Sequence, residues 1–174
     1  MITLTFAFVM LVVLFAVIGA VRGWAKEVLV TFSAILGLFI IAILQRFAPT
    51  ALRSLLLSGE TSAFWIQTGI FLFLVFFGYQ TPNLARISET RFAREKLSDT
   101  LLGFFLGAIN GYLIVGSVWY FMIQANYPFE QITAPQPPPN IVNYLPPDWL
   151  IANNSPIIYF AVAIGFLFVL VVFI

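Results

Sequence analysis

Long apolar stretches alternate with short polar segments along the whole chain. A helix needs about 20 apolar residues to cross the hydrocarbon core of a bilayer. Five stretches reach or approach that length, and they cover residues 2–21, 28–44, 63–79, 101–123 and 157–174. The second and third, about 17 residues each, are at the short end of the range but contain no charge. The pattern predicts an all-α, polytopic helical membrane protein, with a four-helix core followed by a fifth C-terminal transmembrane helix.

The composition supports a membrane protein and excludes several functional classes. The chain is 61% hydrophobic and 9% charged, whereas soluble domains carry about 25% charged residues. A net charge of +1 gives no reason to expect nucleic acid as a partner. The chain has no Cys and no His, which excludes thiol nucleophiles, His general bases and Cys or His metal sites. We therefore predict no catalytic residue, no cofactor and no metal site.

The basic residues predict how the chain is oriented in the membrane. All eight lie in three connections: Arg22 and Lys26 in the first, Arg46 and Arg53 in the second, and Arg86, Arg91, Arg94 and Lys96 in the third. Short connections rich in Lys and Arg stay in the cytoplasm. We therefore expect the first and third connections inside, and the N-terminus outside together with the connection at residues 124–156. Residues 2–21 have no basic segment before them and exceed a signal-peptide core in length, so we expect a retained helix.

The connections differ in composition. Residues 48–60 read either as an interfacial helix, with Pro49 in its first turn, or as an ordinary connector. Residues 83–99 predict a short amphipathic helix. Residues 124–156 hold eight of the ten prolines, which favours a stiff extended spacer, although a proline-reading partner is an alternative. Aromatic residues near its ends are expected at the membrane interface: Tyr127, Trp149 and Tyr159.

Three glycines recur at four-residue steps in the fourth span, "SDTLLGFFLGAINGYLIVGSVWYF". Gly103, Gly107 and Gly111 therefore share one helical stripe. Glycines at this spacing let helices approach closely in lipid, where burial of apolar surface gives little drive for association. Gly19 and Gly23, again four residues apart, offer a counterpart near the first turn. We predict that the stripe docks on the first two helices, and binding of a substrate in the groove is the alternative.

Polar residues near these glycines suggest contacts between helices. Asp99 heads the stripe, where it could cap the fourth helix or pair with Arg22 at the same membrane surface. Asn110 lies near the middle of the fourth span and could hydrogen-bond to a neighbouring helix. No ionisable residue falls deep inside a predicted span, which argues against an autonomous proton-coupled carrier.

Two motifs together resemble the colicin V production protein (CvpA) family. The family pattern G-x-x-R-G-x-x-x-E, at the turn between its first two helices, is matched by Gly19, Arg22, Gly23 and Glu27. The pattern D-x-x-x-G-x-x-x-G-x-x-x-G, which opens its fourth helix, is matched by Asp99, Gly103, Gly107 and Gly111. The resemblance covers residues 2–121 and makes residues 1–123 a CvpA-like membrane core. The proline-rich segment 124–156 and the fifth helix 157–174 fall outside it, and the chain has Asn110 where the family often has Arg.

The resemblance implies an inner-membrane protein associated with colicin V production and export and with envelope maintenance, and no enzymatic activity follows from it. The first functional hypothesis is a scaffold or accessory subunit. The alternative is a small oligomeric transporter or channel component. The expected partners are the lipid bilayer and either further copies of the chain or other membrane proteins.

Overall fold

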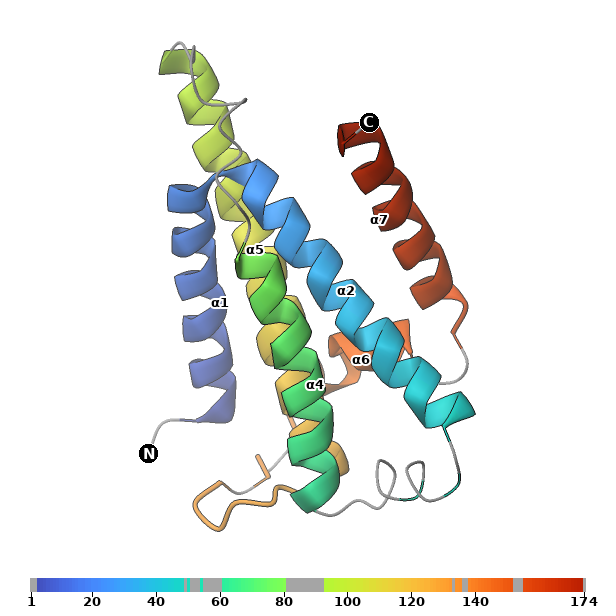
Figure 1. The fold of residues 1–174 in the computed structure, drawn as a ribbon. Helices are drawn as coiled ribbons and strands as arrows, with labels where there is room; N and C mark the ends of the chain where they lie inside the picture. The colour runs from blue at the N-terminus through green and yellow to red at the C-terminus, as the bar shows by residue number, and fades with distance from the viewer. Residues whose placement is uncertain are drawn as a thin grey trace.

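The computed structural model describes residues 3–48, 50, 54, 61–80, 93–132, 134–135, 138–151 and 155–173. These ranges contain helices and turns but no strand. The long helices (Figure 1) are α1 (Leu4–Arg22), α2 (Trp24–Phe47), α4 (Thr61–Tyr79), α5 (Ala93–Gln124) and α7 (Ile157–Phe173). Among the described residues between α5 and α7 are two short elements, η2 (Asn140–Tyr144) and α6 (Pro146–Leu150).

Four of these helices are long and apolar enough to cross a membrane: α1, α2, α4 and α5. The prediction of an all-α, multi-pass membrane protein is therefore confirmed. The fifth predicted span is less complete, because α7 has 17 residues. A helix of that length extends about 25 Å, which is short of a hydrocarbon core of about 30 Å.

Two helices start earlier than their apolar stretches predict. The second helix begins at Trp24 instead of residue 28, so Glu27 is part of its first turn. The fourth span begins within α5, which starts at Ala93 and takes in the end of the predicted amphipathic segment 83–99. Ala, Arg, Glu, Lys and Leu all favour helix, and no Gly or Pro interrupts residues 93–102, so polarity alone does not end the helix. Asp99 is consequently in the second turn of α5 and is not its N-cap.

Helix α5 is at the centre of the packing. It contacts α1 along much of its length and also touches α2, α4 and α6. Helices α1 and α2 diverge from their shared turn (Figure 1), and α2 packs instead on α4 and α7. The main buried cluster joins α2, α4 and α5 through side chains such as Leu38, Phe71 and Phe121. A second cluster, formed by Phe8, Trp119 and Leu145, joins α1 and α5 to the segment before α6.

The connections between helices are described in part. Most of the predicted interfacial segment 48–60 and most of the predicted amphipathic segment 83–99 lie outside the described residues. In the proline-rich segment, η2 and α6 fold back onto the bundle, where Leu145 and Leu150 are buried. The prediction of a stiff spacer is therefore wrong for residues 140–150, because their apolar side chains find partners on α1 and α5.

Candidate functional site

The glycine stripe of α5 lies directly against α1. A Cβ atom added to Gly19 would lie 2.7 Å from Cα of Gly107. A Cβ atom added to Gly111 would lie 3.0 Å from Cα of Val12. The carbonyl oxygens of Gly103 and Gly19 likewise occupy the positions that a side chain on the facing glycine would need. Any larger residue along this stripe would force the two backbones apart, so the glycines set the distance between α1 and α5.

Gly23 makes the turn between α1 and α2. Its φ of 86° and ψ of 155° are values that residues with a side chain rarely adopt. Its N–H donates to the carbonyl oxygen of Gly19 at 2.9 Å, which closes the end of α1. A Cβ atom at Gly23 would also lie 2.9 Å from Oδ2 of Asp99. This position therefore requires glycine for both its backbone conformation and the close approach of α5.

Asp99 contacts the start of α2. Its Oδ1 atom accepts a hydrogen bond of 3.2 Å from the backbone N–H of Trp24, the first residue of α2. Gly23, the N-cap of α2, has no side chain to offer such an acceptor. A carboxylate at this position satisfies an orphan N–H and meets the positive end of the helix dipole. Asp99 is thus a capping residue supplied by α5.

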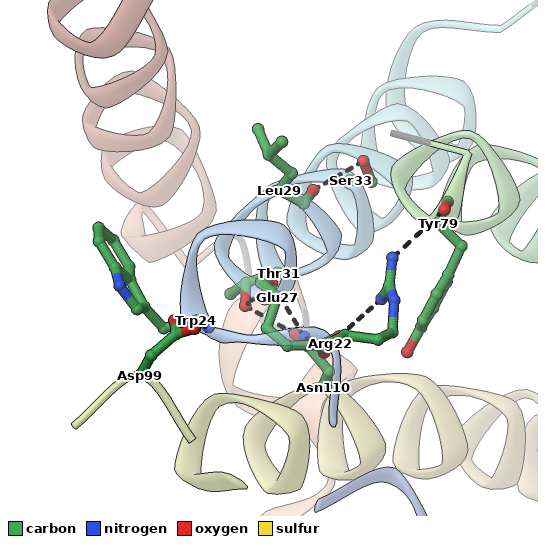
Figure 2. Close-up of polar contacts among 9 residues, drawn as sticks. All are labelled: Arg22, Trp24, Glu27, Leu29, Thr31, Ser33, Tyr79, Asp99 and Asn110. Carbon is green, nitrogen blue, oxygen red and sulfur yellow. Dashed lines mark hydrogen bonds and ion pairs between the residues drawn. The ribbon is translucent and has the colours of Figure 1, made fainter. Parts of the chain in front are cut away.

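Arg22 pairs with Glu27 across the turn (Figure 2). Nη1 of Arg22 lies 2.6 Å from Oε1 of Glu27. Nη2 of Arg22 donates at 3.3 Å to the backbone oxygen of Tyr79, and its Cζ lies 4.3 Å from the centre of the Tyr79 ring. The predicted pairing of Arg22 with Asp99 is therefore wrong. The one-residue turn at Gly23 brings Glu27 back beside Arg22, while Asp99 lies at the start of α2.

Asn110 extends the contact to α5. Its Nδ2 atom donates to Oε2 of Glu27 at 2.7 Å and to the Glu27 backbone oxygen at 2.9 Å. The hydroxyl of Thr31 donates to Oδ1 of Asn110 at 2.6 Å. Asn110 and Glu27 are both fully buried. Arg22, Glu27, Thr31, Tyr79 and Asn110 thus form one connected group, called here the hairpin polar cluster.

Glu27, in the first turn of α2, is buried by the neighbouring helices although it precedes the apolar stretch 28–44 that predicts this span. Its side chain is 0% exposed, and that of Arg22 is 20% exposed. Each carboxylate oxygen of Glu27 has a side-chain partner, Arg22 for Oε1 and Asn110 for Oε2. A buried charge is tolerated when it is paired and hydrogen-bonded in this way. The cluster joins side chains of α1, α2, α4 and α5.

Sequence reasoning missed the roles of Thr31 and Tyr79. Thr31 is four residues after Glu27, so it shares a helical face with that acid, and this spacing could have identified it. Tyr79 is 57 residues from Arg22, and no local pattern links the two. Within the described ranges, no group of three or more His, Cys, Asp or Glu side chains could hold a metal ion. The arrangement is suited to holding helices together.

Comparison with known proteins identifies one family. No curated protein and no solved structure matches the chain. The family model described as colicin V production protein matches residues 4–137. The match extends beyond residue 121 into the proline-rich segment, and it contains the glycine stripe, the turn at Gly23 and the hairpin polar cluster. The match covers well over half of the chain, which therefore belongs to the colicin V production protein family.

Proposed function

We propose that this protein is a non-enzymatic scaffold or accessory subunit of the bacterial inner membrane. In this role it supports production or export of a toxin of the colicin V type, or maintenance of the envelope. The observation that carries the proposal is the internal pairing of Glu27. Glu27, the acid of the hairpin polar cluster, has both carboxylate oxygens engaged by side chains of its own chain. The Glu27 side chain is also 0% exposed, so in this arrangement it is closed to the water or substrate that a carrier acid or a catalytic acid must meet.

The two contact types favour a rigid platform. The glycine stripe brings α1 and α5 into backbone contact. The hairpin polar cluster then links that pair to α2 and α4 through directional hydrogen bonds. Such contacts hold one arrangement of helices, which is what a partner protein requires of a binding surface.

The outer surface of the bundle offers room for partners. Large apolar side chains of α1 and α4, such as Val13, Phe73 and Phe77, are more than half exposed. In a membrane these faces contact lipid, another copy of the chain or another membrane protein. The distribution of basic residues favours an outside N-terminus and an outside proline-rich segment.

The proposal is tested by purification in a mild detergent, with the oligomeric mass and the co-purifying proteins measured together. A scaffold is expected to retain a reproducible set of membrane partners. Gly107→Leu should release them because it separates α1 from α5. Gly69→Leu is the matched control, since a Cβ atom at Gly69 meets nothing within 4 Å.

A second assay separates a scaffold from a transporter or channel component. The purified protein is reconstituted in liposomes, and the leak of protons, potassium and chloride is followed. A scaffold should give the leak of protein-free liposomes. A leak well above that level, abolished by Glu27→Gln, would overturn the proposal in favour of the transporter.

A further inference from the structure

Helix α7 begins well inside the bundle. Its third residue, Tyr159, packs its ring edge-on against Phe39 of α2, with 5.7 Å between the ring centres. Phe39 is eight residues before Phe47, the last residue of α2. Eight residues of helix extend about 12 Å. The start of α7 is thus about two helical turns inward from the end of α2.

The segment before α7 lies at a similar depth on α5. Pro146, the first residue of α6, packs closely against Gly116. A Cβ atom added to Gly116 would lie 2.6 Å from Cδ of Pro146. Gly116 is eight residues before Gln124, the end of α5, which is again about 12 Å. Leu145 is fully buried in the cluster with Phe8. Figure 1 shows α6 beside the middle of the bundle, well above the lower ends of α4 and α5.

One tyrosine of α5 holds this segment through polar contacts. The hydroxyl of Tyr112 donates to the backbone oxygen of Tyr144 in η2. The same hydroxyl accepts a hydrogen bond of 3.2 Å from Nε1 of Trp149 in α6. Tyr112 is twelve residues before Gln124, which is about 18 Å along α5. The tether therefore originates deeper in the bundle than Gly116.

The prolines reduce the number of backbone N–H groups in this segment that need a partner. Irregular backbone is tolerated at membrane depth only when its polar groups have partners. Pro146 and Pro147 occupy the first two positions of α6 and have no N–H to satisfy. The next N–H, that of Asp148, donates to the Leu145 carbonyl at 3.0 Å, and the Ile151 N–H donates to Pro147 at 3.0 Å. A proline-rich composition, which is typical of a spacer, thus also leaves few backbone N–H groups without a partner.

We propose that residues 138–151 form a re-entrant segment that returns into the membrane and, together with α7, completes a discontinuous fifth crossing. The segment covers the depth before the start of α7, which the contact between Tyr159 and Phe39 places about two turns inward from the end of α2. The tether of Tyr112 to η2 and α6 keeps it there. The segment in turn connects the α1–α5 pair to α7, which packs on α2 and α6.

Depth measurement with spin labels tests the location. The chain has no cysteine, so single cysteines can be introduced and labelled in the full-length protein in liposomes. The test position is Tyr144→Cys, whose side chain is 68% exposed on the protein surface. Val9→Cys on α1 is the reference inside the membrane, and Glu130→Cys on the connection after α5 is the aqueous reference.

The collision rates of each label with oxygen and with a water-soluble nickel complex report its depth. A re-entrant segment gives Tyr144→Cys the oxygen-dominated accessibility of Val9→Cys. Nickel-dominated accessibility at Tyr144→Cys, as at Glu130→Cys, would place the segment outside the membrane and overturn the proposal.

A second comparison tests the tether. In the Tyr144→Cys background, Tyr112→Phe removes the hydroxyl that joins η2 to α6, and the label should shift toward the aqueous reference. Tyr159→Phe is the matched control because its ring contact with Phe39 is retained. The label at Val9→Cys should be unchanged in both variants, which reports an intact bundle. An unshifted Tyr144→Cys label in the Tyr112→Phe protein would overturn the tether.

Discussion

The glycine stripe and the hairpin polar cluster hold neighbouring parts of the same bundle by opposite means. Gly103, Gly107 and Gly111 contribute no side chain, and α5 meets α1 through backbone atoms. The hairpin polar cluster contributes only through side chains and the backbone oxygens they reach, including a fully buried carboxylate. The glycine stripe depends on the lack of side chains between α1 and α5. The hairpin polar cluster depends on which groups pair with the Glu27 carboxylate.

The difference separates the distance between helices from their register. A shift of α5 by one glycine step, about 6 Å, would still place glycine against α1. The same shift would move Asn110 away from Glu27 and Asp99 away from the N–H of Trp24. The glycines therefore set how closely the helices approach, and the polar contacts set which residues face each other. Breaking each contact separately tests this division.

The largest loss is expected when Glu27 loses its counter-charge. Arg22→Leu leaves a buried carboxylate without its ion pair, which should lower the free energy of unfolding by about 3–5 kcal/mol. Unfolding in mixed micelles with increasing SDS measures this. The double variant Arg22→Leu with Glu27→Leu should recover most of the loss, because apolar residues often replace a buried pair without penalty. A double variant that is as unstable as Arg22→Leu would contradict the pairing.

The next effect is expected at the glycine stripe. Gly107→Leu places a side chain where Cα of Gly19 and Cα of Ala16 already lie. Overpacking of this kind costs about 1–3 kcal/mol, and the α1–α5 spacing should increase, as measured by distances between spin labels on the two helices. Gly69→Leu on α4 is the control and should change neither quantity. Because Leu favours helix over Gly, equal losses in the two variants could not come from helix propensity, and they would mean that the close approach of α1 does not set the cost.

The parts of the fold that are visible in the sequence are those with local causes. Apolar length identifies the spans, and a four-residue spacing places Gly103, Gly107 and Gly111 on one face without knowledge of the partner. The partner contacts of Asp99 depend on the chain direction at Gly23, whose positive φ no sequence pattern specifies. Helices α2 and α5 start before the apolar stretches that predict them, because polar residues such as Glu27 and Asp99 continue a helix when no Gly or Pro breaks it.

The structure of the proline-rich segment is the least predictable part of the fold, because it depends on contacts that are distant in the sequence. Its composition indicates an extended chain, and that holds for an isolated peptide. The burial of Leu145 and Leu150 depends on surfaces of α1 and α5 that are far away in sequence. Gly116 admits Pro146, but nothing in the sequence distinguishes it from other small residues of an apolar helix.

A smaller loss is expected at Asn110, where the two kinds of contact meet on adjacent residues of α5. Asn110→Ala removes hydrogen bonds to Glu27 and Thr31 but leaves Arg22 paired with the acid. Interhelical hydrogen bonds in membranes contribute about 0.6–2 kcal/mol, so unfolding in SDS should shift by that amount. Ser117→Ala is the control, since its hydroxyl bonds within α5 to the Leu113 carbonyl. A loss as large as that of Arg22→Leu would mean that the hydrogen bonds of Asn110 stabilise the buried carboxylate as much as the ion pair does.

The smallest effect is expected from Asp99→Asn, and it separates the hydrogen bond at the start of α2 from the charge. The amide oxygen of Asn can still accept the Trp24 N–H, so this hydrogen bond is kept while the negative charge beside the positive end of the α2 dipole is lost. That term is about 0.3–1 kcal/mol, whereas Asp99→Ala removes the acceptor as well and should cost about 0.5–2 kcal/mol. Glu130→Gln, an exposed acid on the connection after α5, is the control for a general loss of charge. If Asp99→Asn lowers the free energy of unfolding as much as Asp99→Ala does, the register of α5 at this end depends on the charge of Asp99. The glycine stripe would then begin at a residue that acts through its charge, as the hairpin polar cluster does.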